Sequence, residues 1–478
     1  MKQNLKWKRI LIYILVLTLF LGKGIAGFGI IIGSIFLIIE LINKKFESIE
    51  FFFILMYVYV GLKSIPGFSF QYIEAVNQVG ENRLVPILIL PEFFPEFNLS
   101  FFSLSIPLIL SVFFFSYFLF MLFSRPDLFY GLNRFYIILF ALICIPAIIG
   151  FVKATLNGVN GSLAATKSLF ELSVVFFGFI YARLRSRDTF KLLFLLKHKF
   201  IYVLAFLLIV GLMYNHIVFI YLGVASSIAV YVLLIEKRYL KFSFLILSIF
   251  LGTVNTTFTI VLIPVVCGLL TALSIRLFSF NIRKWLPRIG FIIYIGFMIL
   301  VLSEPKQSIK LQDETSTEGR LYNKIYGDRY FVWTSYIEQI ILANPFLVIP
   351  QEYIKLNTVN DTEREVSFGA HNSLIQLIYY FGIIYGSILF LILYYILSRM
   401  IFYSKYLPKF VQSIAMGLFG VFLVFGLTGH SIVSHAACLF FWLFVGLVTG
   451  LGVQVRQENL TLSKKKLYKD DKSIKKIN

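Results

Sequence analysis

A histidine and two amide side chains stand at the start of an otherwise apolar stretch, FGAHNSLIQLIYYFGIIYG (368–386). Asn372 and Gln376 are four residues apart, so they share one face if the stretch is a helix, and we expect that face to point away from lipid. The positive end of a helix attracts phosphate and keeps a neighbouring imidazole neutral, so His371 could accept a proton beside a bound anion. A buried histidine with only a capping role would give the same pattern.

A second group of polar and aromatic residues lies in GDRYFVWTSYIEQIILANPF (327–346). Four residues recur at the spacing of one helix face: Arg329, Trp333, Tyr336 and Ile340. Asp328 could cap the start of this helix, and Asn344 ends it because a residue before proline avoids helical angles. We therefore predict an amphipathic helix over 329–342 on the outer face of the protein, with Arg329 in its first turn. The alternative is an interfacial helix whose Arg329 and Trp333 only anchor it among lipid headgroups.

Long apolar segments determine where these two groups of residues lie. Hydrophobic residues make up 59% of the chain and charged residues 14%, against about 25% charged residues in an ordinary soluble domain. A helix needs roughly 20 apolar residues to cross a bilayer, and about fourteen such segments follow one another along the chain. They are 9–22, 25–42, 49–65, 100–123, 135–152, 163–182, 200–214, 216–235, 241–254, 256–276, 286–303, 371–397, 410–428 and 431–452. We therefore predict an all-α, polytopic membrane protein.

Lysine and arginine residues predict the orientation of the spans. With the N-terminus in the cytoplasm, every loop predicted to be cytoplasmic is basic, and both termini lie inside. The net charge of +20 is then mostly a collar against cytoplasmic lipid, which argues against nucleic acid as a partner. The predicted parts are an N-terminal bundle (1–303), a large external loop (304–370), C-terminal spans (371–452) and a basic cytoplasmic tail (453–478).

The sequence predicts no metal and no cofactor. Three cysteines, Cys144, Cys267 and Cys438, all fall inside apolar segments. Because none has a partner at a useful spacing, we interpret them as small apolar residues. Four histidines fall at the outer ends of spans or at external turns: His216, His371, His430 and His435. Their spacing does not support a metal cluster, although His430 could line the same cavity as His371.

Three motifs together resemble the bacterial O-antigen polymerase and O-antigen ligase family. They are RYFVW (329–333), NPF (344–346) and HNSLIQLIYYFG (371–382), which occur in a long external loop and at the start of the span that follows it. Members of that family transfer glycans linked to undecaprenyl diphosphate on the outer face of the cytoplasmic membrane, without a nucleotide sugar or a metal. The resemblance covers residues 320–390, and elsewhere it rests on topology.

The resemblance implies a role for each matching residue. His371 would be the essential base, Asn372 would orient it or a sugar hydroxyl, and Arg329 would hold the diphosphate. The family often has Ser-Arg where a middle span ends, but this chain has LGTVNTTFT (251–259) there. Four other external cations could supply the second diphosphate contact: Arg320, Lys324, Arg83 or Lys153. Three aromatic residues could pack against sugar rings: Tyr330, Trp333 and Tyr336.

We therefore predict a membrane glycosyltransferase that polymerises lipid-linked oligosaccharide repeat units of a capsule, exopolysaccharide or O-antigen. The predicted reaction is inverting glycosyl transfer at the outer face of the cytoplasmic membrane. The expected partners are undecaprenyl-diphosphate-linked oligosaccharides, membrane lipid, a flippase and a chain-length regulator. An O-antigen ligase is an alternative that the same residues would serve.

Two further alternatives belong to other classes. A lipid-linked oligosaccharide flippase would have charged residues deep within several spans, whereas Glu40, Lys63 and Glu171 lie near span ends. A glycosyltransferase with a dolichol-like donor would have an early acidic external loop, but the first external turn contains Lys23 and no acidic residue. The glycines Gly382 and Gly386 have GxxxG spacing, which by itself indicates only close helix packing.

Overall fold

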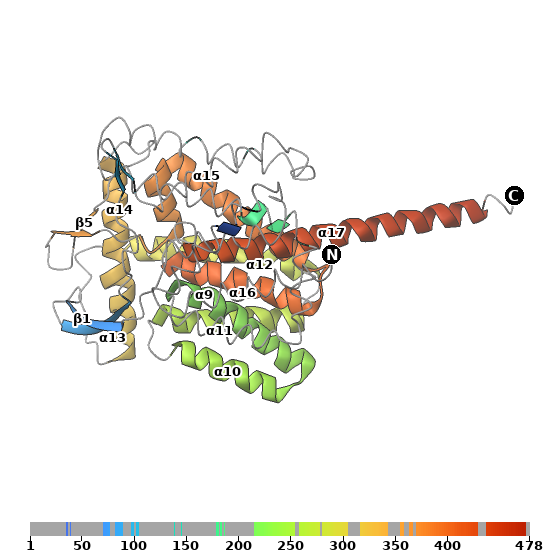
Figure 1. Ribbon diagram of the computed structural model, residues 1–478, viewed down its shortest axis with the longest axis horizontal. Coiled ribbons are helices and arrows are strands. Elements are labelled where there is room, and N and C mark those ends of the chain that lie inside the picture. Colours follow the sequence, from blue (N-terminus) through green and yellow to red (C-terminus); the bar gives the residue numbers. More distant parts are fainter. Residues whose placement is uncertain are drawn as a thin grey trace.

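The computed structural model describes a helical C-terminal half together with short pieces of the N-terminal half (Figure 1). The described ranges from residue 70 on are 70–76, 82–88, 97–99, 102–104, 215–253, 258–277, 280–304, 316–342, 354–357, 363–366, 370–428 and 436–474. Isolated positions or short groups between 35 and 186 complete them. The predicted spans that begin before residue 215 therefore lie outside the described residues, apart from those positions.

Helices form the main part of the described structure. The first are α9 (Asn215–Tyr231), its π-helical continuation η3 (Val232–Glu236), α10 (Tyr239–Thr253), α11 (Phe258–Leu277) and α12 (Phe280–Leu302). The predicted external loop contains α13 (Thr317–Tyr322), the π-helical segment η5 (Asn323–Tyr330) and α14 (Phe331–Leu342). The last are α15 (Ser373–Ser404), α16 (Lys409–Thr428) and α17 (Ala436–Ile474).

Three antiparallel hairpins of short strands are the part of the fold that an all-α prediction missed. They pair β1 (Phe70–Val76) with β2 (Asn82–Leu88), β3 (Phe97–Leu99) with β4 (Phe102–Leu104), and β5 (Ile354–Asn357) with β6 (Glu363–Val366). All but β4 lie in segments predicted to be external, and β4 lies at the start of the predicted span 100–123. Their β-branched and aromatic residues favour strands, in runs too short to cross a membrane.

Four described helices are long and apolar enough to cross a membrane, which supports the prediction of a polytopic helical membrane protein. They are Phe219–Glu236, Trp285–Leu302, Phe381–Ser404 and Lys409–Thr428. Two shorter apolar helices cover Tyr239–Phe250 and Val261–Ile275. These agree with the predicted spans between 216 and 303 and with 410–428. The predicted span 371–397 corresponds to α15 (Ser373–Ser404), which is interrupted by non-helical backbone at Gly382.

Contacts between helices show that α12 runs antiparallel to α15 and parallel to α16. The Tyr394 hydroxyl of α15 donates to the carbonyl of Pro287, near the start of α12, at 2.5 Å. The Tyr294 hydroxyl, farther along α12, donates to the carbonyl of Gly426, near the end of α16, at 2.8 Å. The end of α12, the start of α15 and the end of α16 therefore lie at one end of the bundle. This is the arrangement that alternating external and cytoplasmic loops require.

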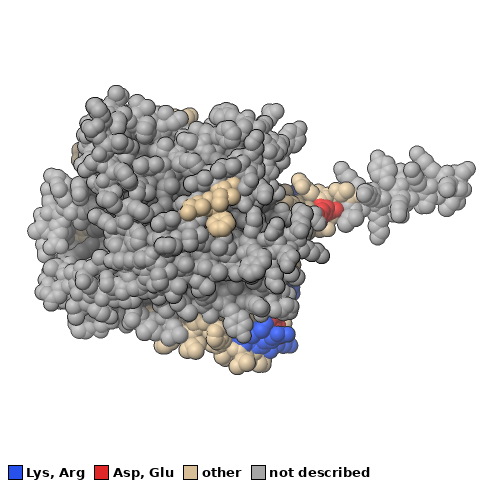
Figure 2. Space-filling model, viewed as in Figure 1, with Lys and Arg blue, Asp and Glu red and all other residues tan. Residues whose placement is uncertain are grey.

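The opposite end of the bundle carries basic residues. Figure 2 shows Lys and Arg side chains gathered at the edge of the molecule near the turn between η3 and α10. The described basic residues of this turn are Lys237, Arg238 and Lys241, and Lys241 pairs with Glu236 at 3.6 Å. From the same end, α17 extends away from the bundle (Figure 1). The segment predicted as a separate tail from residue 453 continues this helix to Ile474.

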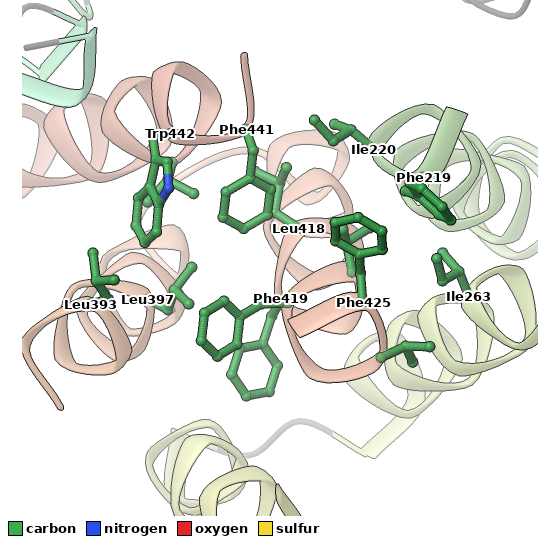
Figure 3. Packing of buried hydrophobic residues seen from close by; sticks show 14 of the residues in the cluster. Phe219, Ile220, Ile263, Leu393, Leu397, Leu418, Phe419, Phe425, Phe441 and Trp442 are labelled. Atoms are coloured by element: carbon green, nitrogen blue, oxygen red, sulfur yellow. The ribbon is translucent and has the colours of Figure 1, made fainter. Parts of the chain in front are cut away.

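Close packing of α9, α11 and α16 depends on glycines. A Cβ atom on Gly417 of α16 would lie 2.6 Å from the carbonyl oxygen of Gly223 in α9. The thiol of Cys267 in α11 donates to the carbonyl of Gly417 at 3.3 Å, which agrees with its predicted place as a small buried residue. Around this contact the core is dense, with the rings of Phe219 and Phe425 only 4.0 Å apart between centroids (Figure 3). Small residues at such contacts let membrane helices approach closely.

We expect Gly417→Ala to destabilise the bundle by about 1–3 kcal/mol, because the added methyl group would overlap the backbone of α9. Gly296→Ala is the matched control, since a Cβ on Gly296 meets nothing within 4 Å and alanine favours a helix more than glycine does. Thermal unfolding of the two variants in the same detergent measures the difference. Equal unfolding temperatures for Gly417→Ala and Gly296→Ala would contradict the packing described above.

Candidate functional site

The side chain of Asn372 caps α15 and connects three helices. Its Oδ1 atom accepts from the backbone N–H groups of Leu374 and Ile375 at 2.9 and 3.1 Å. Its Nδ2 group donates to the carbonyl of Leu427, at the end of α16, at 3.3 Å. The Tyr294 hydroxyl of α12 lies 3.2 Å from the same Oδ1 atom. Asn372 is fully buried, so these contacts give a buried amide the partners that it needs.

His371 has a backbone conformation that few residues adopt. Its φ is +51°, in the left-handed region, which costs an L-residue about 1–2 kcal/mol. Two neighbours maintain this conformation, Asn372 through its cap and Ala370, whose N–H group donates to Oε1 of Gln376 at 2.6 Å. Both amide side chains are buried, so the polar face points into the bundle as predicted. The imidazole of His371 itself is only half-buried. Strained residues held in this way are common at functional sites.

The backbone amides at the start of α15 are less able to bind an anion than the sequence suggested. Asn372 Oδ1 already accepts from the N–H groups of Leu374 and Ile375. The N–H group of Gln376 donates to the Asn372 carbonyl at 2.9 Å, which is the first bond of the helix itself. A helix N-terminus binds phosphate through such groups only while they lack other acceptors. A diphosphate here would therefore depend on cationic side chains.

Arg329 is buried at the end of a π-helical segment. Only 8% of its surface is exposed. It is the last residue but one of η5, and α14 begins two residues later, at Phe331. The predicted cap at Asp328 is wrong, because Asp328 lies inside η5 and the helical path already begins at Thr317. There Ser316 Oγ accepts from the Gly319 N–H group at 2.9 Å. π-helical turns are rare and often occur at functional sites, and a buried arginine is stable only when its charge is compensated.

The predicted helix 329–342 corresponds to α14, but it is not a headgroup anchor. Trp333 and Tyr336 are buried, with 0% and 2% exposure. Trp333 packs edge-on against Phe297 of α12 at 6.3 Å, and Tyr336 packs against Tyr379 of α15 at 4.9 Å. In Figure 1, α13, η5 and α14 form one rod that crosses an end of the bundle. The helix therefore covers the end at which α15 begins, with its aromatic residues turned inward.

The residue Tyr326 shows how η5 packs on the end of α12. Its ring lies 4.8 Å from that of Tyr322. Burial, and then the nearby carboxylate of Glu304 just beyond α12, raise the pKa of Tyr326. The hydroxyl, which is protonated at neutral pH in any tyrosine, can donate a hydrogen bond.

A sharp bend divides α15 into a short first part and the apolar span. Gly382 has φ +80° and ψ 166°, outside the helical region. A Cβ on Gly386 would lie 2.5 Å from the Cα atom of Ile378, although residues eight apart in a straight helix are separated by about 12 Å. The chain therefore folds back at Gly382. The close contact predicted from the GxxxG spacing occurs within α15 rather than between two helices.

The two predicted groups of residues meet on α12. Asn372 contacts Tyr294, and Trp333 contacts Phe297, one helical turn farther along. Tyr330 is also buried and packs on the ring of Phe331.

Arg320 lies on α13 and Lys324 on η5, but their side chains are not among those described. Lys153, His430, His435 and the side chains of Arg83 and His216 also lie outside the described part.

Tyr294 is a site residue that the sequence did not predict. A tyrosine inside an apolar span resembles an ordinary core residue, and only its hydroxyl signals a need for a partner. Trp333 differs from Tyr294, whose hydroxyl has partners. The indole N–H group of Trp333 is buried without a hydrogen-bond partner. Among the described residues, no three His, Cys, Asp or Glu side chains come together as metal ligands.

Comparisons of the chain with family models, curated proteins and solved structures found no match. The resemblance to O-antigen polymerases and ligases therefore stays a prediction from the three motifs.

We expect Tyr294→Phe to destabilise the protein by about 1–2 kcal/mol, because the Gly426 carbonyl would lose its donor and the Asn372 cap a neighbour. Tyr385→Phe is the control, since Tyr385 is exposed on the same bundle and its hydroxyl has no described hydrogen bond. Urea or thermal unfolding of both variants in detergent tests this expectation. A Tyr294→Phe protein as stable as Tyr385→Phe would show that the contact between α12 and α15 is not stabilising.

Proposed function

We propose that this protein polymerises undecaprenyl-diphosphate-linked oligosaccharide repeat units at the outer face of the cytoplasmic membrane. The main support is the conformation of His371. It is half-buried and left-handed, and its neighbours Ala370 and Asn372 are both held by hydrogen bonds. The helix that covers this end of the bundle begins two residues after the buried Arg329.

In the proposed reaction His371 is the general base. It takes the proton of an acceptor sugar hydroxyl, and the freed oxygen lone pair attacks the anomeric carbon of the donor. A bond forms between that oxygen and the anomeric carbon, while the bond from the carbon to the diphosphate breaks with inversion. The products are a glycan longer by the transferred chain, undecaprenyl diphosphate and a proton, which His371 releases to water.

The negative charge of the leaving diphosphate must be neutralised by cationic side chains, because the amides at the start of α15 already have acceptors. Arg329 is the first candidate, since a guanidinium can bind two phosphate oxygens at once. Arg320 and Lys324 are candidates for further contacts, because α13 and η5 continue directly into the segment with Arg329.

The burial of the remaining residues favours positioning roles over direct contact with sugar. Trp333 is fully buried against Phe297, so we assign it to holding η5 and α14 on α12. Tyr330 is nearly as buried, and we assign it to the same contact. Asn372 is buried with its acceptor and donor in use, so it positions His371 through the backbone. A flippase and a chain-length regulator remain proposed partners.

We expect His371→Asn to lower polymer formation by about 100-fold or more, the usual contribution of a general base. Asparagine tolerates the left-handed conformation, so the variant separates proton transfer from backbone strain. Polymer is measured in a deletion strain that expresses the variant at the level of the wild type. Full-length polymer made by His371→Asn would contradict the proposed base.

The lipid-linked glycan that accumulates in the deletion strain tests the polymerase assignment. We expect single repeat units on undecaprenyl diphosphate at the outer face, because flipping continues and only joining stops. Arg329→Gln should give the same product, since it removes charge from the leaving-group site. Long lipid-linked chains would instead indicate a ligase, and repeat units retained at the inner face would indicate a flippase.

A further inference from the structure

A cluster of cations and aromatic rings lies at the end of the bundle opposite His371. It comprises Arg399 and Lys405 at the end of α15, Arg456 of α17, and the rings of Phe402 and Tyr403. The Arg399 Cζ atom is 4.8 Å from the centre of the Tyr403 ring and 5.3 Å from that of Phe402. The Arg456 Cζ atom is 5.9 Å from both ring centres. Lys405 Nζ lies 4.3 Å from the Phe402 ring.

Neither guanidinium group of this cluster pairs with a carboxylate among the residues that the structure describes. Arg399 donates from Nη2 to the Tyr403 hydroxyl at 2.6 Å. Within the described part of the chain, Arg456 has the two ring contacts and neither arginine has an ion pair. Both guanidinium groups therefore lie against the same two rings, with no carboxylate beside them among the described residues. Two like charges held in this way repel one another, and a bound anion would reduce the repulsion.

The cluster is built into the packing of α15 and α17. A Cβ on Gly452 of α17 would lie 2.6 Å from the Tyr403 carbonyl oxygen and 2.8 Å from its Cβ atom. Gly452 has no side chain, so α17 can approach α15 closely at this point. One helical turn after Gly452, Arg456 lies beside the Tyr403 ring. All three cations are half-buried, with their charged groups against the aromatic rings.

The position of the cluster matches the headgroup level of the membrane. Arg399, Phe402 and Tyr403 lie in the last turns of the apolar span Phe381–Ser404, and Lys405 directly follows it. Beyond the cluster, α17 leaves the bundle (Figure 1). The basic turn between η3 and α10 belongs to the same end. In the predicted orientation this end is cytoplasmic, where anionic lipids attract basic residues.

We propose that Arg399, Arg456 and Lys405 bind the phosphate of an anionic phospholipid headgroup. The guanidinium groups donate to the phosphate oxygens, Lys405 adds a third positive charge, and Phe402 contacts the glycerol region. The lipid is a structural ligand that holds α17 against α15. This site is independent of the proposed reaction, which takes place at the other end of the bundle.

Lipid retention by the full-length protein tests this site. The wild type and variants are placed in nanodiscs of phosphatidylcholine with a minor fraction of phosphatidylglycerol, and the lipids that stay bound on extraction are counted by native mass spectrometry. We expect the wild type to retain phosphatidylglycerol preferentially. The double variant Arg399→Gln/Arg456→Gln should bind it about tenfold more weakly or worse, because each lost contact is to a charged group.

Two further variants separate lipid binding from loss of structure. Arg399→Lys/Arg456→Lys keeps both charges and should retain part of the binding. Arg288→Gln removes a guanidinium that lies 4.7 Å from the Trp285 ring at the same end, and it should bind like the wild type. Retention of phosphatidylglycerol by the double glutamine variant at the wild-type level would overturn the proposal, as would a loss in Arg288→Gln as large as in that variant.

A soluble competitor distinguishes a lipid from a free phosphate. Inorganic phosphate at millimolar concentration should leave phosphatidylglycerol bound, since a lipid also has its apolar contacts. Displacement by inorganic phosphate, or equal retention of phosphatidylcholine and phosphatidylglycerol, would show that the cluster is not an anionic lipid site.

Discussion

The buried amide of Asn372 is the contact on which the candidate site depends. An unpaired amide in apolar surroundings costs several kcal/mol, so this side chain can exist there only with all its partners in place. Those partners come from the start of α15, from the end of α16 and from Tyr294 of α12. Tyr294 lies eight residues before the end of α12, about 12 Å below it at 1.5 Å per residue. The start of α15 therefore lies within the bundle, and His371 with it.

The bend at Gly382 explains how a helix can begin at that depth and still be followed by a complete span. Residues 373–381 form a short first helix, the chain folds back, and the apolar span runs from Phe381 to Ser404. Irregular backbone at membrane depth is tolerated only where it is buried in protein or lines a cavity. The packing of Ile378 on Gly386 and of Tyr379 on Tyr336 meets that condition.

Residue patterns could predict the helical class, the spans between 216 and 303 and the inward polar face, because each depends on composition or on local spacing. The start of α15, beside His371, was predicted as a simple helix start at the membrane surface. Its depth depends on Tyr294, 78 positions away in the sequence, which no local pattern reveals. The hairpins were missed because hydropathy does not separate short apolar strands from surface loops. The π-helical turn at Arg329 was missed because it follows from packing on α12 and not from a capping residue.

The central claim is that His371 accepts the proton of the attacking hydroxyl during glycosyl transfer from undecaprenyl diphosphate. The most direct measurement is the release of undecaprenyl diphosphate by purified protein in nanodiscs supplied with a lipid-linked repeat unit. The account predicts release together with a dimer of the repeat unit in the wild type, and neither product in a correctly folded His371→Asn protein. Equal release by the two proteins, or no release by the wild type with substrate bound, would contradict it.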